Sequence, residues 1–148
     1  MIRKLTKRDR RKLIGLLRQL WPNRSLDSEG LHNVIEKYAA GRDYRIYGYE
    51  DRAGVVGIIT MSFRWSLFYE GKVALIEDLV VDESSRRRGI GRKLVRFVEE
   101  LISGDNTIRG IEVNTDLQRE DAQTFWESCG YSRLAFQFRK KKNDAQTG

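Results

Sequence analysis

The chain has 148 residues, of which 40% are hydrophobic and 33% charged, and a formal net charge of +7. This composition favours a single soluble globular domain, residues 1–148, over a disordered chain. No stretch approaches the ~20 apolar residues of a membrane span. The first ten residues hold no apolar signal region, and the single cysteine, Cys129, cannot form an internal disulfide, so we expect a cytoplasmic protein.

The N-terminal part predicts an edge strand and a helix. Residues 2–5 form a short segment of strand length. An amphipathic helix is expected to start near Lys7 and to stop at Pro22, because proline cannot continue a helix. The residues that carry its helical spacing are Leu13, Leu16, Leu17 and Leu20.

A second helix follows a short loop. Asp27 or Ser28 is a candidate N-cap, since a short polar side chain can accept from the first free amides of a helix. Gly41 is expected to end this helix. Its predicted buried stripe consists of Leu31, Val34, Ile35 and Tyr38.

Three strands are then expected. Residues 44–50 and 55–63 flank a glycine-containing turn at 51–54 and predict a hairpin. The second strand continues toward Tyr69, and the turn at 70–71 leads into a central strand over residues 72–81.

The C-terminal part predicts a strand, a helix and a last strand. The strands cover residues 108–113 and 133–139, the helix covers 120–129, and Gly130 caps it. Residues 140–148 are expected to be frayed. The inward residues of the helix are predicted to be Ala122, Phe125, Trp126 and Cys129.

The stretch from residue 75 to 101 organises the chain. It reads as a buried strand with an acidic pair, Glu77 and Asp78, then a polar turn, a basic glycine-containing loop and an amphipathic helix. A helix start has amide groups without intrahelical acceptors and partial positive charge. The basic residues around it therefore favour a phosphate-binding site over an ordinary solvated turn.

The loop sequence from Arg86 to Gly91, R-R-R-G-I-G, resembles the Q/R-x-x-G-x-G/A signature of the GNAT (N-acetyltransferase) superfamily. The segment from Ala122 to Tyr131 is similar to the A-x-x-F-Y-x-x-x-G-F segment of the same family. The resemblance covers roughly residues 2–139. It implies an α/β (α+β) fold in one domain, with a mixed, mostly antiparallel, twisted sheet of six to seven strands and helices on both faces.

The resemblance also implies acetyl-CoA as cofactor, with its pyrophosphate on the loop and its pantetheine arm against the central strand where two strands splay apart. An amide near Val80 would then face the developing oxyanion. The implied cofactor-binding residues are Leu79, Val80, Val81, Arg86, Arg87, Arg88, Gly89, Ile90, Gly91, Arg92, Lys93, Asn114 and Trp126.

Acetyl transfer to an amine needs a base, because most alkyl amines are protonated near neutral pH. Glu77 and Asp78 are the candidates, with Glu77 preferred. As neighbours on a strand they point to opposite faces unless a bulge intervenes. In the competing interpretation, one carboxylate pairs with an arginine and the other faces solvent. Trp126 stands where many family members carry a tyrosine acid, so the general acid is left open.

The sequence leaves the acceptor open between a small-molecule amine, a peptide N-terminus and a lysine. Candidate acceptor-side residues are Trp21, Arg24, Trp65 and Tyr69, each of which has an equally good packing interpretation. We expect an acyltransferase, with a non-catalytic CoA-binding sensor and a basic nucleic-acid-binding module as alternatives. We expect no metal, membrane or nucleic-acid partner, and leave a homodimer open.

Overall fold

The computed structural model describes residues 1–26 and 28–142, in two compact units, Met1–Asn114 and the part from Thr115 onward. Asp27, one of the two candidate N-caps, and residues 143–148 of the predicted tail lie outside the described residues.

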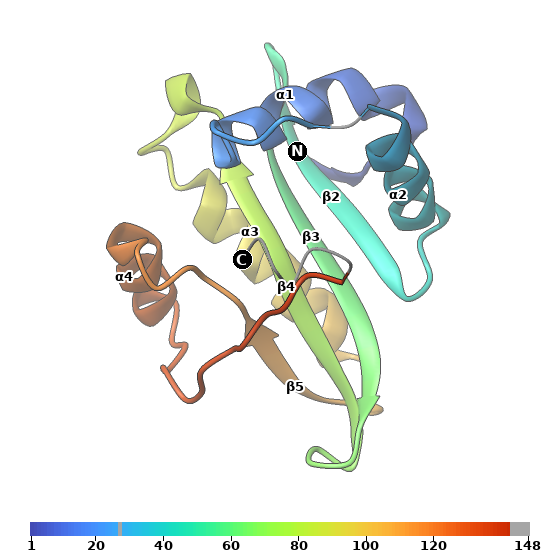
Figure 1. The fold of residues 1–148 in the computed structure, drawn as a ribbon, viewed down its shortest axis with the longest axis vertical. Coiled ribbons are helices and arrows are strands. Elements are labelled where there is room, and N and C mark those ends of the chain that lie inside the picture. Colours follow the sequence, from blue (N-terminus) through green and yellow to red (C-terminus); the bar gives the residue numbers. More distant parts are fainter. Residues whose placement is uncertain (27, 143–148) are drawn as a thin grey trace. The chain divides into compact units, whose positions relative to one another are not determined.

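The first unit is a five-stranded sheet with helices (Figure 1). The strands lie in the order β1-β2-β3-β4-β5, and each pair is antiparallel except β4 with β5, which is parallel. The elements in chain order are β1 Ile2–Lys4, η1 Lys7–Asp9, α1 Arg10–Leu20, α2 Ser28–Ala40, β2 Tyr44–Asp51, β3 Gly54–Ser66, β4 Gly71–Val81, η2 Glu83–Ser85, α3 Ile90–Ser103 and β5 Ile108–Val113.

Helices cover both faces of the sheet, as the sequence predicts. Ile58 of β3 packs with the buried leucines of α1 and with Ile35 of α2. Its neighbour Gly57 faces the other way, where a β-carbon would meet Ile90 at 3.1 Å and Leu94 at 3.3 Å, both on α3. Successive residues of a strand point to opposite faces. The continuous buried run of β3 therefore separates α1 and α2 from α3.

The second unit contains α4, Glu120–Ser128, which ends as predicted. Gly130 adopts a positive φ of 93°, and the amide of Tyr131 donates to the carbonyl of Trp126 at 3.0 Å. The ring of Trp126 packs edge-on against Phe125 and Tyr131, with centroids 5.2 and 5.3 Å away. A glycine that ends a helix in this way satisfies its last carbonyl groups.

Two sequence predictions are wrong. Residues 133–139 form no strand, so the described part of the chain has five strands rather than six or seven. Alternating apolar residues suit a strand, but a strand also needs a neighbour for its backbone hydrogen bonds. Val34 is 49% exposed and does not belong to the buried stripe of α2, because that helix presents a narrower face to β2 than the pattern suggests.

Candidate active site

The central strand β4 extends beyond the end of its parallel neighbour, β5. The last pair of residues between β4 and β5 is Ile76 with Val113, where β5 ends, whereas β4 continues to Val81. The backbone of Leu79 to Val81 therefore extends beyond the end of β5. An extended ligand can add to such an edge as though it were another strand.

A β-bulge interrupts the alternation of β4 at its acidic pair. Thr60 of β3 pairs with Asp78, and the next residue, Met61, pairs with Ile76, so Glu77 is the extra residue. The Thr60 hydroxyl donates to Oδ2 of Asp78 at 2.6 Å, and the Ser62 hydroxyl donates to Oε1 of Glu77 at 2.7 Å.

Thr60 and Ser62 are two residues apart on β3 and so share one face of the sheet. Glu77 and Asp78, which bond to them, must therefore lie on that same face. The sequence predicts that the two carboxylates point to opposite faces of the strand unless a bulge intervenes. The structure contains that bulge, so they share one face. Two carboxylates thus stand together on one side of the strand.

Tyr38 of α2 forms a further hydrogen bond to this carboxylate pair. Its hydroxyl donates to Oε2 of Glu77 at 2.5 Å. Burial, followed by the hydrogen bond to Glu77, raises the pKa of Tyr38 well above its usual value, so the phenol stays protonated as a donor. Both oxygens of Glu77 thus accept a hydroxyl hydrogen bond, which fixes the orientation of the carboxylate.

Asp78 has a different environment from Glu77. Burial raises the pKa of Asp78, the hydrogen bond from Thr60 opposes that shift, and the negative charge of Glu77 adds to it. A carboxyl group in this environment holds a proton more tightly than an exposed aspartate does. A carboxyl group with a raised pKa beside a second carboxylate is suited to proton transfer.

The loop between β4 and α3 has the backbone geometry of an anion site. Arg87 and Gly89 adopt positive φ values of 66° and 73°, and α3 begins directly after Gly89 with no side-chain cap. A β-carbon on Gly89 would meet no atom within 4 Å, so the approach to this backbone is open. The first amides of α3 have no intrahelical acceptors, as at any helix start.

Two arginines of the loop already contact the protein. Nε of Arg86 donates to the carbonyl of Val81 at 3.1 Å, and Nη1 of Arg88 forms an ion pair with Asp51 at 3.0 Å. The Arg88 hydrogen bond is the main reason why the pKa of Asp51 is lowered. These two residues therefore hold the loop against the end of β4 and the β2–β3 turn, a role that the sequence analysis did not foresee.

The structure separates the four acceptor-side candidates into two groups. Trp21 follows α1, where it packs against the core cluster and lies under the guanidinium of Arg24, 5.6 Å from the ring centroid. Trp65 and Tyr69 belong to the β3–β4 hairpin, at the opposite end of β4 from the loop. β4 has 11 residues, so at about 3.3 Å per residue its ends are roughly 33 Å apart.

Trp65 is 70% exposed, whereas Tyr69 lies over Gly110 of β5 and donates to Glu112 at 3.0 Å. Of the remaining predicted residues, Asn114 is exposed directly after β5. Trp126 belongs to the second unit and is buried there among its aromatic neighbours. The structure brings Glu77 and Asp78 together on β4, the strand that leads into the β4–α3 loop, and it places Trp65 and Tyr69 at the other end of that strand.

Sequence reasoning missed Tyr38, Ser62 and Thr60, the three hydroxyl donors to the carboxylates. A signal was present in each case, because a hydroxyl inside an apolar stripe needs a buried partner. The pattern could not say which acceptor each hydroxyl would meet.

The family model for the acetyltransferase (GNAT) family matches residues 11–131. Glucosamine 6-phosphate N-acetyltransferase 1 of Oryza sativa subsp. japonica is 31% identical over 82% of this chain and 73% of its own length. The corresponding enzyme of Arabidopsis thaliana is 31% identical over 94% of both chains. Among the residues that the structure describes, no helix has both the length and the apolar character needed to cross a membrane.

Solved structures agree with these sequence matches. The crystal structure of glucosamine-6-phosphate N-acetyltransferase from Arabidopsis thaliana superposes with a TM-score of 0.77 at 27% identity, covering 95% of this chain and 97% of that one. A putative acetyltransferase from Agrobacterium tumefaciens superposes with a TM-score of 0.83 over 96% and 99%. The chain belongs to the acetyltransferase (GNAT) family and is an acyltransferase of that family, whose members use acetyl-CoA as acetyl donor.

Proposed function

We propose that this protein transfers an acetyl group from acetyl-CoA to the primary amine of a small acceptor by direct attack within a ternary complex. One observation carries the proposal. The bulge at Glu77 places two carboxylates on one face of β4, beside the stretch that extends past β5 and leads into the β4–α3 loop. A base, an edge for an extended ligand and an anion site thus belong to one continuous segment.

The residues present fit acetyl-CoA. The open backbone at Gly89 and the uncapped start of α3 suit a diphosphate, and Arg87, Arg92 and Lys93 add positive charge there. The backbone of Leu79 to Val81 would hold the extended arm. When bound, acetyl-CoA supplies the activated thioester.

The carboxylates would handle the proton. An ammonium group must lose a proton before its nitrogen can attack, directly or through water. We assign this task to Glu77, which Tyr38 and Ser62 hold in one orientation. Asp78 is the alternative base, since burial raises its pKa above that of an ordinary aspartate. The departing thiolate would take its proton from solvent, because the indole of Trp126 is no practical acid.

The acceptor that we propose is a small amine bearing a phosphoryl or phosphonate group. Two relatives are named for glucosamine 6-phosphate and one, 30% identical over 58% of this chain, is an aminoalkylphosphonate N-acetyltransferase of Salmonella typhimurium. The net charge of +7 favours an anionic acceptor over a polyamine. A peptide amine is the competing acceptor, with the same chemistry at the nitrogen.

Thiol release from acetyl-CoA with a panel of amines tests the proposal. We expect turnover with phosphorylated amines, a loss of kcat of at least about 100-fold in Glu77→Gln, and little change in the KM of acetyl-CoA. Glu36→Gln, on the exposed side of α2, is the matched control. A larger loss in Asp78→Asn would make Asp78 the base.

The same assay separates the alternatives. Calorimetric binding of acetyl-CoA without thiol release toward any amine would favour a sensor. Binding of duplex DNA in place of acetyl-CoA would favour a nucleic-acid module, and either result would contradict the proposed reaction.

A further inference from the structure

A concave surface outside the candidate active site is lined mainly by lysine and arginine side chains. It is a groove of about 780 Å³ between the start of α1 and α2. Its lining residues are Lys7, Arg8, Asp9, Arg10, Arg11, Lys12, Ile14, Arg18 and His32. None of these residues belongs to the carboxylate pair or to the β4–α3 loop.

The helix geometry explains why the charges gather there. Lys7, Arg11, Ile14 and Arg18 recur at intervals of four, three and four residues, so they form one stripe along η1 and α1. The buried leucines take the opposite side of α1. Ile14 is partly buried and packs against the core cluster, whereas the three basic members of the stripe are exposed.

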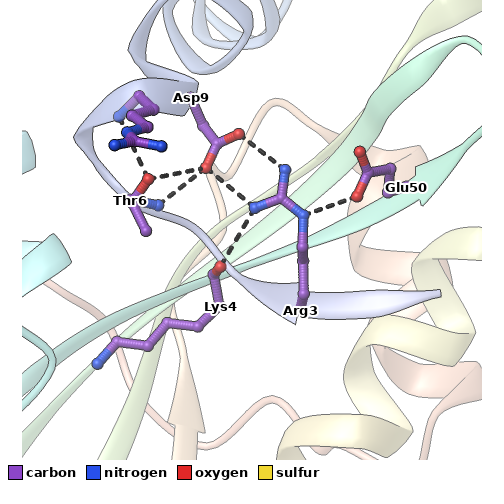
Figure 2. A network of polar contacts seen from close by, with 6 residues as sticks. Arg3, Lys4, Thr6, Asp9 and Glu50 are labelled. Carbon is purple, nitrogen blue, oxygen red and sulfur yellow. Dashed lines mark hydrogen bonds and ion pairs between the residues drawn. The ribbon is translucent and has the colours of Figure 1, made fainter.

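The only acid of the groove lining is already neutralised from outside it. Arg3 donates to both oxygens of Asp9, at 2.8 and 3.0 Å, and also to Glu50 at 2.7 Å (Figure 2). The pKa of Asp9 is lowered chiefly by this hydrogen bonding. Asp9 also accepts from the amide of Thr6, which fixes the first turn before α1. The groove therefore keeps a strong excess of positive charge.

We propose that this groove binds a ligand with several phosphoryl groups close together. Guanidinium groups present planar donor forks that match phosphate oxygens, and arginine makes up four of the nine lining residues. No Phe, Tyr or Trp is among those residues, so His32 offers the only ring on which a base could stack. The phosphoryl oxygens themselves are thus what the groove recognises. The ligand is either a free oligophosphate or a nucleic-acid backbone, which share this chemistry.

Calorimetry with inorganic tripolyphosphate at about 0.15 M salt tests the proposal. The groove variant is Arg8→Gln, Arg11→Gln and Arg18→Gln combined. The control variant removes three exposed charges elsewhere, Lys37→Gln, Arg42→Gln and Arg109→Gln. We expect saturable binding by the unaltered protein, a loss of affinity of at least about 10-fold in the groove variant and less than about 2-fold in the control.

A second arm uses a short single-stranded RNA of mixed sequence. Tighter binding of RNA than of tripolyphosphate would identify a nucleic-acid backbone as the ligand of the groove. Tighter binding of tripolyphosphate would identify a free oligophosphate as the ligand. Both results support the site. Equal losses in the groove and control variants would overturn it, because net charge alone would then explain the binding.

The cofactor site must be distinguished from the groove. We expect the groove variant to keep its unfolding midpoint and its KM for acetyl-CoA. Arg11 shares a cavity with Asp82 and Ser84 of the β4–α3 loop, but the described hydrogen bonds of that loop to α1 come from Gln19, which the variant keeps. Displacement of tripolyphosphate by CoA, with unchanged binding in the groove variant, would show that the anion sits at the α3 N-terminus and would overturn the proposal. Failure of acetyl transfer would leave this binding result unaffected.

Discussion

Gln19, near the end of α1, donates from Nε2 to Oδ2 of Asp82 at 3.3 Å, although the two residues are 63 positions apart. The Oε1 atom of the same side chain accepts the amide of Glu83 at 2.9 Å. Asp82 in turn accepts from the amide and hydroxyl of Ser84, at 3.0 and 2.7 Å. One side-chain amide therefore ties α1 to the first turn of the β4–α3 loop.

Gln19→Ala should weaken cofactor binding more than it slows the chemical step. It removes two hydrogen bonds that together stabilise the loop by about 1 kcal/mol at an exposed position. We expect a 3- to 10-fold rise, roughly, in the KM of acetyl-CoA with kcat reduced less, measured by thiol release. Lys37→Ala, an exposed change on α2, serves as control. An unchanged KM would mean that the loop keeps its shape without Gln19.

Gly91→Ala should separate cofactor affinity from stability. Gly91 is the second residue of α3, where alanine raises helix propensity by up to about 1 kcal/mol. In the proposed cofactor site, the added methyl group would hinder the approach of a diphosphate to the backbone. We expect an unfolding midpoint that is unchanged or higher and a KM for acetyl-CoA at least about 10-fold higher, a difference of about 1.4 kcal/mol.

Gly89→Ala is the informative partner of that variant. Gly89 has a φ of 73°, which is unfavourable for alanine by about 1–2 kcal/mol. Both stability and cofactor affinity should therefore fall. Normal affinity in both glycine variants would contradict the assignment of the loop.

Asp78 and Asp9 should make the stability of the protein depend on pH in opposite directions. Burial raises the pKa of Asp78, so the folded state binds this proton more tightly than the unfolded chain does. Its contribution to stability is greatest when the carboxyl is protonated and falls as pH rises through the raised pKa. Asp78→Asn should thus be more stable than the unaltered protein at about pH 8, with the difference shrinking toward about pH 4.

Asp9→Asn should behave in the opposite way. Arg3 lowers the pKa of Asp9 in the folded state, so that contribution is present above the ordinary aspartate pKa and is lost as pH falls. The variant should be less stable near neutral pH and approach the unaltered protein in acid. Denaturant unfolding at several pH values measures the stability of both variants. If both were stabilised, or both destabilised, near neutral pH, the two environments described here would be contradicted.

Arg24→Gln and Trp65→Ala should differ in their effect on the acceptor. Arg24 lies over the ring of Trp21, which follows Gln19, the residue that contacts the loop, by two positions. Trp65 lies near the end of β3, in the β3–β4 hairpin. For a phosphorylated amine we expect the acceptor KM to rise about 3- to 10-fold in Arg24→Gln and to stay unchanged in Trp65→Ala. The reverse pattern in steady-state kinetics would place the acceptor toward the hairpin.

The sequence by itself determined the elements whose signals are local. Leucines at helical spacing, Pro22 and Gly41 are enough to locate α1 and the end of α2, and the span predicted for β5 agrees with the structure at both ends. The β4–α3 loop was also predictable, because its glycines, basic residues and following helix lie within one short stretch. Such features depend on neighbours a few residues apart along the chain.

Only the tertiary structure decided how distant segments meet. The face of Glu77 depends on its register against β3, and one extra residue moves that side chain to the other side of the sheet. The donors Tyr38 and Gln19 reach their partners across 39 and 63 residues. The apolar alternation of residues 133–139 could not create a strand, because strand formation requires a paired backbone as well as a pattern.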